Sequence, residues 1–393
     1  MKTAPPERLR RWLDNYKATA VILCNTGLLF LALNLLFLLF GWLTAEPPGQ
    51  RLVNKYGLEK LRAAHPKLTD AEILQLQEET WGRHLAYEPF TEFKEGKFSG
   101  KHLNVSPAGF RFGAEAGPWP PDPQRMNLFV FGGSTTFGYG VADGETLPAQ
   151  LQVQLRRLAP AKQVSVYNYG RGFFASTQER ILFQQLLLQG RRPAIAVFVD
   201  GVNDAVFPAD ESALSADLDA AVRRKNGQAH DLGLLGQFPL LRPVERLLVG
   251  DATPAREQAL WRMVNPSGQP PSLEQMTQWV GTRFLTNARL SAATGRELGV
   301  RTLFVWQPCP FYHSDPTRFP FKFNAGDQFV RATYEHMTRR DRKELPEHFL
   351  WLADGQDTLP GPLYVDAAHY SSAFNAVLAG RIADWMKSNG WLD

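Results

Sequence analysis

The sequence contains little cysteine and no cluster of metal-binding residues. Its 393 residues include only Cys24 and Cys309, and Cys24 lies in an apolar N-terminal stretch, so we do not expect an intramolecular disulfide. Histidine, cysteine and carboxylate residues nowhere recur at the spacing of a metal site. We therefore expect a protein that works without a metal or another cofactor.

The chain also lacks a large excess of either charge, and it has no internal repeat. Its formal net charge is +4 and its pI is about 9.0, while the arginines are scattered without interleaved aromatic residues or a repeated spacing. This pattern does not predict a nucleic-acid partner. Hydrophobic residues make up 44% of the sequence, which is enough to pack the core of one large domain with additions, or of two domains.

One long hydrophobic run lies near the N-terminus. Residues 19–44 are apolar apart from a few threonine, asparagine and glycine residues, and this length exceeds the ~20 residues that span the hydrocarbon core of a bilayer. A cleaved signal peptide is the alternative, but its apolar region would be only about 7–15 residues long, and Leu43-Thr44-Ala45 is a poor cleavage site. We therefore predict an uncleaved transmembrane signal anchor over residues 19–44.

Basic residues near the two ends of this run predict its orientation. Four of them lie shortly before the run, namely Arg8, Arg10, Arg11 and Lys17. After the run, the first basic residue is Arg51. Because basic flanks remain preferentially in the cytoplasm, residues 1–18 are expected to form a cytoplasmic tail. The protein would then be a single-pass protein of the inner or plasma membrane, with the rest of the chain periplasmic or extracellular.

After the span, we expect residues 45–126 to form an extracytoplasmic lead-in region. Leu68–Glu72 predicts the start of a helix, with Thr69 or Asp70 as its N-cap. Tyr87–Pro123 is rich in phenylalanine, glycine, proline and lysine and has no sustained periodicity. This second segment is predicted to be a loop-rich stretch that wraps onto the following domain.

From residue 127 to the C-terminus, the pattern alternates between strands and helices. Short apolar runs predict strands at residues 128–131, 164–167, 194–199, 300–306 and 349–352. Apolar residues at helical spacing predict helices at residues 147–158, 282–298, 328–345 and 373–387, and Ser176-Thr-Gln-Glu179 predicts a capping box. This alternation predicts a parallel sheet with right-handed crossovers. Residues 205–276 are expected to be an insertion, either beside a substrate cleft or as a structural flap.

The first strand ends in a motif that is suited to a nucleophile. Leu128–Phe131 stops at Gly132-Gly133-Ser134, which predicts a tight turn that presents the serine at the rim of the sheet, where open α/β sheets bind ligands. A nucleophile elbow of the α/β-hydrolase type would need glycine where Thr136 stands, and a Walker loop would need a lysine nearby. A flavodoxin-like phosphate site and a plain strand-to-helix turn are the alternatives.

The next two strands also end in segments that could serve a reaction. Asn168-Tyr-Gly170-Arg-Gly172 follows the second strand, and Gly201-Val-Asn203-Asp204 follows the third. In a parallel sheet these ends lie on the same edge as Ser134, so the three segments are expected to meet. A backbone N–H of the second segment, the Asn203 amide and the Ser134 N–H would together make an oxyanion hole.

A serine nucleophile needs a base, and the base needs an orienting group. Of the eight histidines, only His369 has an acidic residue three positions before it, in Asp366-Ala-Ala-His369. In a loop, this spacing lets the carboxylate bond one ring nitrogen, so that the other ring nitrogen faces Ser134. Taken alone, such a motif is more often a surface turn.

Together the four blocks resemble the SGNH hydrolase superfamily, also called GDSL-like esterases. The matching segments are Gly132–Ser134, Asn168–Gly172, Gly201–Asp204 and Asp366–His369. Their order and spacing agree with the family, and the resemblance covers the chain from about residue 127 to the C-terminus. It implies a three-layer α/β/α, flavodoxin-like fold for a catalytic domain at residues 127–393, and ester hydrolysis without a metal.

The resemblance also implies a role for each residue of the site. Ser134 would attack the ester carbonyl, His369 would act as base, and Asp366 would orient His369. The oxyanion would be held by the Ser134 N–H, the Gly172 N–H and the Asn203 side chain.

Two departures from the family pattern affect these assignments. Gly-Gly-Ser replaces the usual Gly-Asp-Ser, which leaves the nucleophile unchanged. In the second block, Phe173 stands where glycine is expected, so Gly170 and Phe173 are alternatives to Gly172 as the backbone donor.

The leading hypothesis is therefore a membrane-anchored serine esterase that removes acyl groups, such as O-acetyl groups, from an envelope glycan or lipid. The envelope substrate follows from the predicted location alone. An O-acyltransferase, in which a sugar hydroxyl replaces water, would use the same residues. A non-catalytic glycan- or partner-binding module is disfavoured because the serine, asparagine, aspartate and histidine occur together. The sequence does not indicate the acyl chain length or the oligomeric state.

Overall fold

The computed structural model describes residues 6–206, 238–241, 271–314, 319, 321, 327–356 and 358–393. The chain divides into two compact units. One contains helix α1 (Glu7–Thr44), and the other contains residues 47–216 and 258–393. Most of the insertion predicted at residues 205–276 lies outside the described residues.

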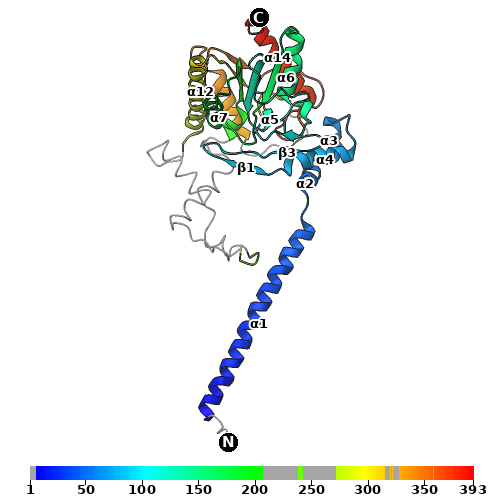
Figure 1. Cartoon of the computed structure of the whole chain (residues 1–393), viewed down its shortest axis with the longest axis vertical. Coiled ribbons are helices and arrows are strands. Elements are labelled where there is room, and N and C mark those ends of the chain that lie inside the picture. Colours follow the sequence, from blue (N-terminus) through cyan, green and yellow to red (C-terminus); the bar gives the residue numbers. More distant parts are fainter. Residues whose placement is uncertain are drawn as a thin grey trace. The chain divides into compact units, whose positions relative to one another are not determined.

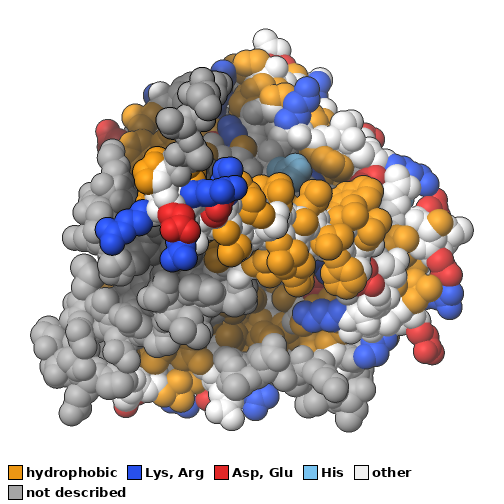
Figure 2. Space-filling view, turned by 90° about the horizontal axis from the view of Figure 1, so that it is seen from below, with side chains coloured by type: hydrophobic (Ala, Val, Ile, Leu, Met, Phe, Trp, Pro, Cys, Tyr) orange, Lys and Arg blue, Asp and Glu red, His pale blue; other side chains and the backbone are white. Residues whose placement is uncertain are grey.

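Helix α1 is the one helix of the described part that is long and apolar enough to cross a membrane. Its 38 residues correspond to about 57 Å, against the ~30 Å of a bilayer's hydrocarbon core. Leu23, Leu35 and Trp42 are 67%, 67% and 74% exposed, an unusual apolar surface for a helix in water. In Figure 2 its hydrophobic side chains form a band with charged side chains at one end. The helix begins at Glu7 rather than residue 19, because nothing in the basic tail interrupts it.

A five-stranded sheet forms the centre of the second unit. Its strands are β5 (Met126–Gly132), β6 (Val164–Asn168), β7 (Ile195–Asp200), β8 (Arg301–Trp306) and β9 (Phe349–Trp351). They are hydrogen-bonded in the order β6-β5-β7-β8-β9, and every pair is parallel. The predicted parallel sheet is confirmed, with the strand order of a flavodoxin-like fold.

Helices cover both faces of this sheet (Figure 1). One layer contains α6 (Leu147–Leu158) and α14 (Ser372–Ser388), and the other contains α7 (Ser176–Leu188), α12 (Leu273–Glu297) and α13 (Asp327–Thr338). The arrangement is therefore a three-layer α/β/α sandwich. Such a sheet has no solvated face, which explains why its strands are continuous apolar runs.

The central strand β5 shows how the two cores are divided. Phe129 and Phe131 point into the core beneath α7 and α12, whereas Leu128 and Val130 point into the core beneath α6 and α14. All four side chains are fully buried. Side-chain packing on both faces holds the strand in place up to Gly132, directly before Gly133 and Ser134.

The lead-in region belongs to the same compact unit as the sheet and contains seven short elements. These are α2 (Pro48–Tyr56), α3 (Leu58–Ala64), α4 (Asp70–Trp81), β1 (Leu85–Glu88), β2 (Glu92–Glu95), β3 (Phe98–Ser99) and β4 (Asn104–Val105). Thr69, one of the two predicted N-caps, caps α4 and forms a capping box with Glu72. The two antiparallel hairpins, β1-β2 and β3-β4, were not predicted, because strands of two to four residues are too short to show alternation.

Three predicted helix ends differ from the structure. The capping box at Ser176 is wrong: Ala175 is the N-cap of α7, and the Ser176 hydroxyl donates to Asp204 Oδ1 at 2.6 Å instead. Helix α12 begins at Leu273, where Ser272 caps it, rather than at residue 282. Helix α13 ends at Thr338 rather than at residue 345.

Candidate active site

The nucleophile candidate stands at the end of the central strand. Ser134 is the first residue of the short helix α5 (Ser134–Phe137), directly after Gly132 and Gly133. A Cβ on Gly132 would lie 2.1 Å from Thr136 Oγ1, and a Cβ on Gly133 would lie 2.3 Å from Asn203 Nδ2. Both glycines are therefore needed for close approach, the second one to the asparagine of the third block.

The serine, the histidine and the aspartate of the predicted site are in contact, although 235 positions separate the first two. Ser134 Oγ lies 2.8 Å from His369 Nε2. On the other side of the ring, His369 Nδ1 lies 2.7 Å from Asp366 Oδ2 and 2.8 Å from Oδ1. Because a carboxylate only accepts hydrogen bonds, Nδ1 carries the proton, which leaves Nε2 to accept from the serine hydroxyl.

Asp366 is held as a buried carboxylate. Its side chain is almost fully enclosed, and Oδ1 also accepts the backbone N–H groups of Ala368 and His369, each at 2.9 Å. Burial tends to raise the pKa of Asp366, but the charge and hydrogen bonds of His369, together with these backbone donors, outweigh it and lower the pKa. The aspartate therefore stays ionised and keeps the imidazole in one tautomer.

Two aromatic rings, which also contact each other, pack against the imidazole of His369. Tyr139 stacks on it with ring centroids 5.3 Å apart and an interplanar angle of 22°. Trp81, at the end of α4, meets it edge-on at 5.8 Å. Neither residue belongs to the four sequence blocks. Tyr139, five positions after the serine, could have been suspected from its proximity, but Trp81 carries no local signal.

Asn203 lies beside the nucleophile turn in the short helix α8 (Val202–Val206). Its Nδ2 donates to the backbone carbonyl of Phe174 at 2.7 Å. A side-chain amide nitrogen carries two hydrogens. One is used to tie the third block to the second, and the other is suited to a substrate oxygen.

The second block does not present its glycines as predicted. The N–H of Gly172 donates to Glu95 Oε1 at 3.1 Å, and the N–H of Gly170 donates to Asn168 Oδ1 at 3.0 Å. The Gly172 N–H is therefore already paired in this structure, and its role as an oxyanion donor stays a prediction. The next residue, Phe173, has φ = 65°, a left-handed conformation that favours glycine. It occupies the position at which the resemblance to the SGNH hydrolases predicts glycine.

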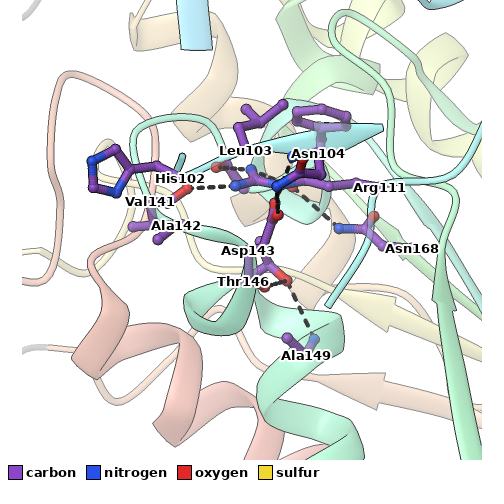
Figure 3. Close-up of polar contacts among 12 residues, drawn as sticks. His102, Leu103, Asn104, Arg111, Val141, Ala142, Asp143, Thr146, Ala149 and Asn168 are labelled. Atoms are coloured by element: carbon purple, nitrogen blue, oxygen red, sulfur yellow. Dashed lines mark hydrogen bonds and ion pairs between the residues drawn. The ribbon is translucent and has the colours of Figure 1, made fainter. Parts of the chain in front are cut away.

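A buried ion pair supports α5 from the lead-in region (Figure 3). The Arg111 guanidinium pairs with Asp143 at 2.8 Å and donates to the backbone carbonyls of Phe137, Gly138 and Val141. Phe137 and Gly138 end the helix that carries Ser134, so the arginine satisfies the free carbonyls at that end. The contact spans long sequence separations, and for this reason no local pattern revealed it.

Among the residues that the structure describes, no three histidine, cysteine or carboxylate side chains are arranged to hold a metal ion. Cys24 and Cys309 are both free thiols.

Comparison with known proteins finds solved structures of similar fold. A protein described as lipolytic and of the G-D-S-L family, from Desulfitobacterium hafniense, is 13% identical, and the match covers 66% of this chain and 99% of that one with a TM-score of 0.34. A lipase/acylhydrolase from Enterococcus faecalis is 15% identical over 67% and 96%, with a TM-score of 0.35. A family two carbohydrate esterase from Clostridium thermocellum is 10% identical over 70% and 67%, with a TM-score of 0.34. No protein-family model and no curated protein matches the chain.

Proposed function

We propose that this protein is a serine ester hydrolase whose catalytic triad is Ser134, His369 and Asp366. The observation that carries the proposal is the unbroken chain of hydrogen bonds, from Ser134 Oγ to His369 Nε2 and from His369 Nδ1 to Asp366. A nucleophile within reach of its base, and a base held by a third group, are the geometric requirements of this chemistry.

In the first half of the reaction, Ser134 Oγ attacks the ester carbonyl carbon while His369 Nε2 takes the hydroxyl proton. The tetrahedral intermediate then collapses, and His369 gives that proton to the departing alcohol. This leaves an acyl group on Ser134. Asp366 stabilises the imidazolium that exists between the two proton transfers without itself taking the proton.

In the second half, water attacks the acyl-enzyme and His369 takes one of its protons. Collapse of the second intermediate returns the proton to Ser134 Oγ and releases the carboxylic acid. An acceptor alcohol in place of water would give a new ester, so product analysis with an added sugar distinguishes hydrolysis from acyl transfer.

The oxyanion of both intermediates needs donors placed in advance. We assign the Ser134 N–H, the Asn203 side-chain amide and the N–H of Phe173. Phe173 replaces Gly172 in this set because it has a positive φ and precedes Phe174, the residue whose carbonyl holds Asn203.

Helix α1 supports a location at a membrane. The basic residues before it, from Arg8 to Lys17, support a cytoplasmic N-terminus by the positive-inside rule. The catalytic unit would then face the periplasm or the exterior, and an acyl ester of an envelope glycan or lipid is the substrate class that this location supplies.

The test of this function is hydrolysis of a short-chain aryl ester by the full-length chain in detergent. Ser134→Ala should lower kcat at least 10³-fold, in line with loss of a triad member. The matched control is Ser388→Ala, which changes an exposed serine at the end of α14. Equal activity of both variants would reject Ser134 as the nucleophile.

A further inference from the structure

We propose that the lead-in region completes the catalytic centre. In this proposal Glu95 is a positioning residue that acts on Gly172 and Phe173, called here the oxyanion segment, and on the imidazole of His369. This inference rests on the proposed esterase function and extends it to residues outside the four blocks. Figure 1 shows the lead-in elements β1, β3 and α4 along the end of the sandwich at which α5 lies.

Glu95 is the last residue of β2, and its carboxylate is 1% exposed. Oε1 accepts both the Gly172 N–H and the Tyr139 hydroxyl, each at 3.1 Å. Oε2 accepts from Arg83 Nη2 at 3.0 Å. One buried carboxylate therefore ties together the second block, the segment after the nucleophile and the end of α4.

The first effect concerns the oxyanion segment. The bond to Glu95 holds the peptide between Arg171 and Gly172, one peptide before the one that carries the Phe173 N–H. A Cβ on Gly172 would lie 2.5 Å from the hydroxyl of Tyr139, so only glycine allows this approach. The backbone from which Phe173 continues is thus held by a residue 77 positions before Gly172.

The second effect concerns the base. The Tyr139 hydroxyl is held by Glu95, and its ring is the plane on which His369 stacks. Trp81 packs beside both rings, edge-on to Tyr139 at 5.0 Å and to His369 at 5.8 Å. Because the imidazole must keep its orientation through two proton transfers, fixing the stacked ring limits the rotation of the base.

Arg83 pairs with the buried carboxylate of Glu95 and ties it to the end of α4, where Trp81 lies. Its side chain is 3% exposed, and it donates to the carbonyls of Glu79 and Thr80 in the last turn of α4. The guanidinium carbon also lies 4.6 Å from the ring centroid of Phe137. A buried charge that has an oppositely charged partner is tolerated, whereas a charge left without its partner is not.

The experiment measures kcat and KM of the full-length chain with an aryl ester for Glu95→Gln, Tyr139→Phe and the double variant. Glutamine cannot satisfy all three donors, since its amide nitrogen would face a donor, and phenylalanine keeps the stacked ring but loses the hydroxyl. Each single variant should lower kcat about 10- to 100-fold with KM changed less than about threefold. The double variant should be no slower than the slower single variant, because both break one linkage.

The matched control is Glu79→Gln. Glu79 is also a buried carboxylate of the lead-in that accepts backbone N–H groups, those of Lys101, His102 and Leu103. Its carboxylate also accepts from the Gln75 side chain, so it anchors the turn between β3 and β4 to α4. A thermal midpoint is recorded for every variant, and kcat is measured well below it.

The outcomes separate the two proposals. If Ser134→Ala is inactive while Glu95→Gln and Tyr139→Phe retain the kcat of Glu79→Gln, the positioning role of Glu95 is overturned and the esterase function stands. A fall in thermal midpoint with unchanged kcat overturns it in the same way. A wild-type chain that does not react with the ester overturns both proposals. If Glu95→Gln does not fold, Tyr139→Phe alone decides between these outcomes.

Discussion

At the scale of single residues, the site depends on how both nitrogens of one imidazole are used. His369 Nδ1 faces Asp366 and Nε2 faces Ser134, with both distances below 3 Å. The aspartate is buried, and its own remaining bonds are to backbone N–H groups. The loop from Asp366 to His369 is therefore held by its own hydrogen bonds, which fix the tautomer of the base.

This arrangement predicts the result of Asp366→Asn. An asparagine amide can present a donor to Nδ1 and stabilise the tautomer in which Nε2 carries the proton, so the base would no longer accept from Ser134. We expect kcat to fall about 10³- to 10⁴-fold, measured with an aryl ester. Asp384→Asn, an exposed position on α14, should leave kcat unchanged. A loss below about tenfold in Asp366→Asn would argue against its orienting role.

A second group of buried carboxyls predicts how stability depends on pH. Glu179 and Asp200 are 1% and 3% exposed. Burial and the neighbouring acidic groups, including Asp204, raise the pKa of both well above the usual range. Because the folded chain then binds protons more tightly than the unfolded chain, this contribution to stability is full below the unfolded pKa values of about 4 and is lost as the pH rises.

Glu179→Gln removes one of these ionisations. We expect the thermal midpoint of the variant, relative to wild type, to increase by a few degrees between pH 4 and pH 8. Differential scanning fluorimetry at several pH values measures this. Glu297→Gln, at an exposed position of α12, should show a difference that does not change with pH. A constant difference for Glu179→Gln would mean that its carboxyl is not held neutral in the folded chain.

At the scale of elements, the sequence was informative wherever a pattern is local. The strands β5 to β8 and the helix α6 were predicted close to their observed bounds, because buried parallel strands form continuous apolar runs and α6 has a clear apolar stripe. The glycine-to-serine turn and the Asp366-to-His369 loop were recognisable for the same reason. Each block is a short segment, so the residues that identify it are neighbours in the sequence.

Long-range contacts explain what the sequence did not predict. Gly172 was assigned to the oxyanion hole, but its N–H is taken by Glu95, a residue of a lead-in hairpin that was itself not predicted. Ser176 fits a capping box, but its hydroxyl is drawn to Asp204 in another element. Trp81 and Arg111 reach the site only because the lead-in folds against the sheet. No spacing along the chain encodes these contacts.

The contact between the first and third blocks gives a prediction at this scale. Gly133 has φ = −79° and ψ = −155°, which alanine can adopt, yet a Cβ would lie 2.3 Å from Asn203 Nδ2. Gly133→Ala should therefore displace the asparagine and lower kcat about 10²- to 10³-fold, as for loss of an oxyanion donor, while the chain still folds.

The control for this variant is Gly380→Ala within α14, where nothing lies within 4 Å of the added Cβ. It should raise stability by up to ~1 kcal/mol and leave kcat unchanged. Circular dichroism melts and steady-state kinetics of the two variants provide the comparison. A Gly133→Ala variant with normal kcat would show that Asn203 does not need its present position.

At the scale of the whole molecule, two predictions concern the membrane: that α1 is an anchor, and that the catalytic unit lies on the side opposite the cytoplasm. The exposed apolar surface of α1 supports a membrane anchor, and the basic residues before it predict which side the catalytic unit faces. A periplasm-active alkaline phosphatase fused after Asp393 should be active in a bacterial host. Activity only of a reporter that requires the cytoplasm would contradict the predicted orientation. Substituting Arg8, Arg10 and Arg11 together by glutamate should weaken the preference for a cytoplasmic N-terminus and so lower the activity of this reporter.

The central claim is that Ser134 is a nucleophile activated by His369 across the full length of the domain. The most direct measurement is peptide mass spectrometry of the intact full-length protein after reaction with a fluorophosphonate, which is attacked by an activated serine. We predict a single phosphonyl adduct on Ser134, and its loss in His369→Ala. An adduct on another residue, or undiminished modification of Ser134 in His369→Ala, would contradict the account.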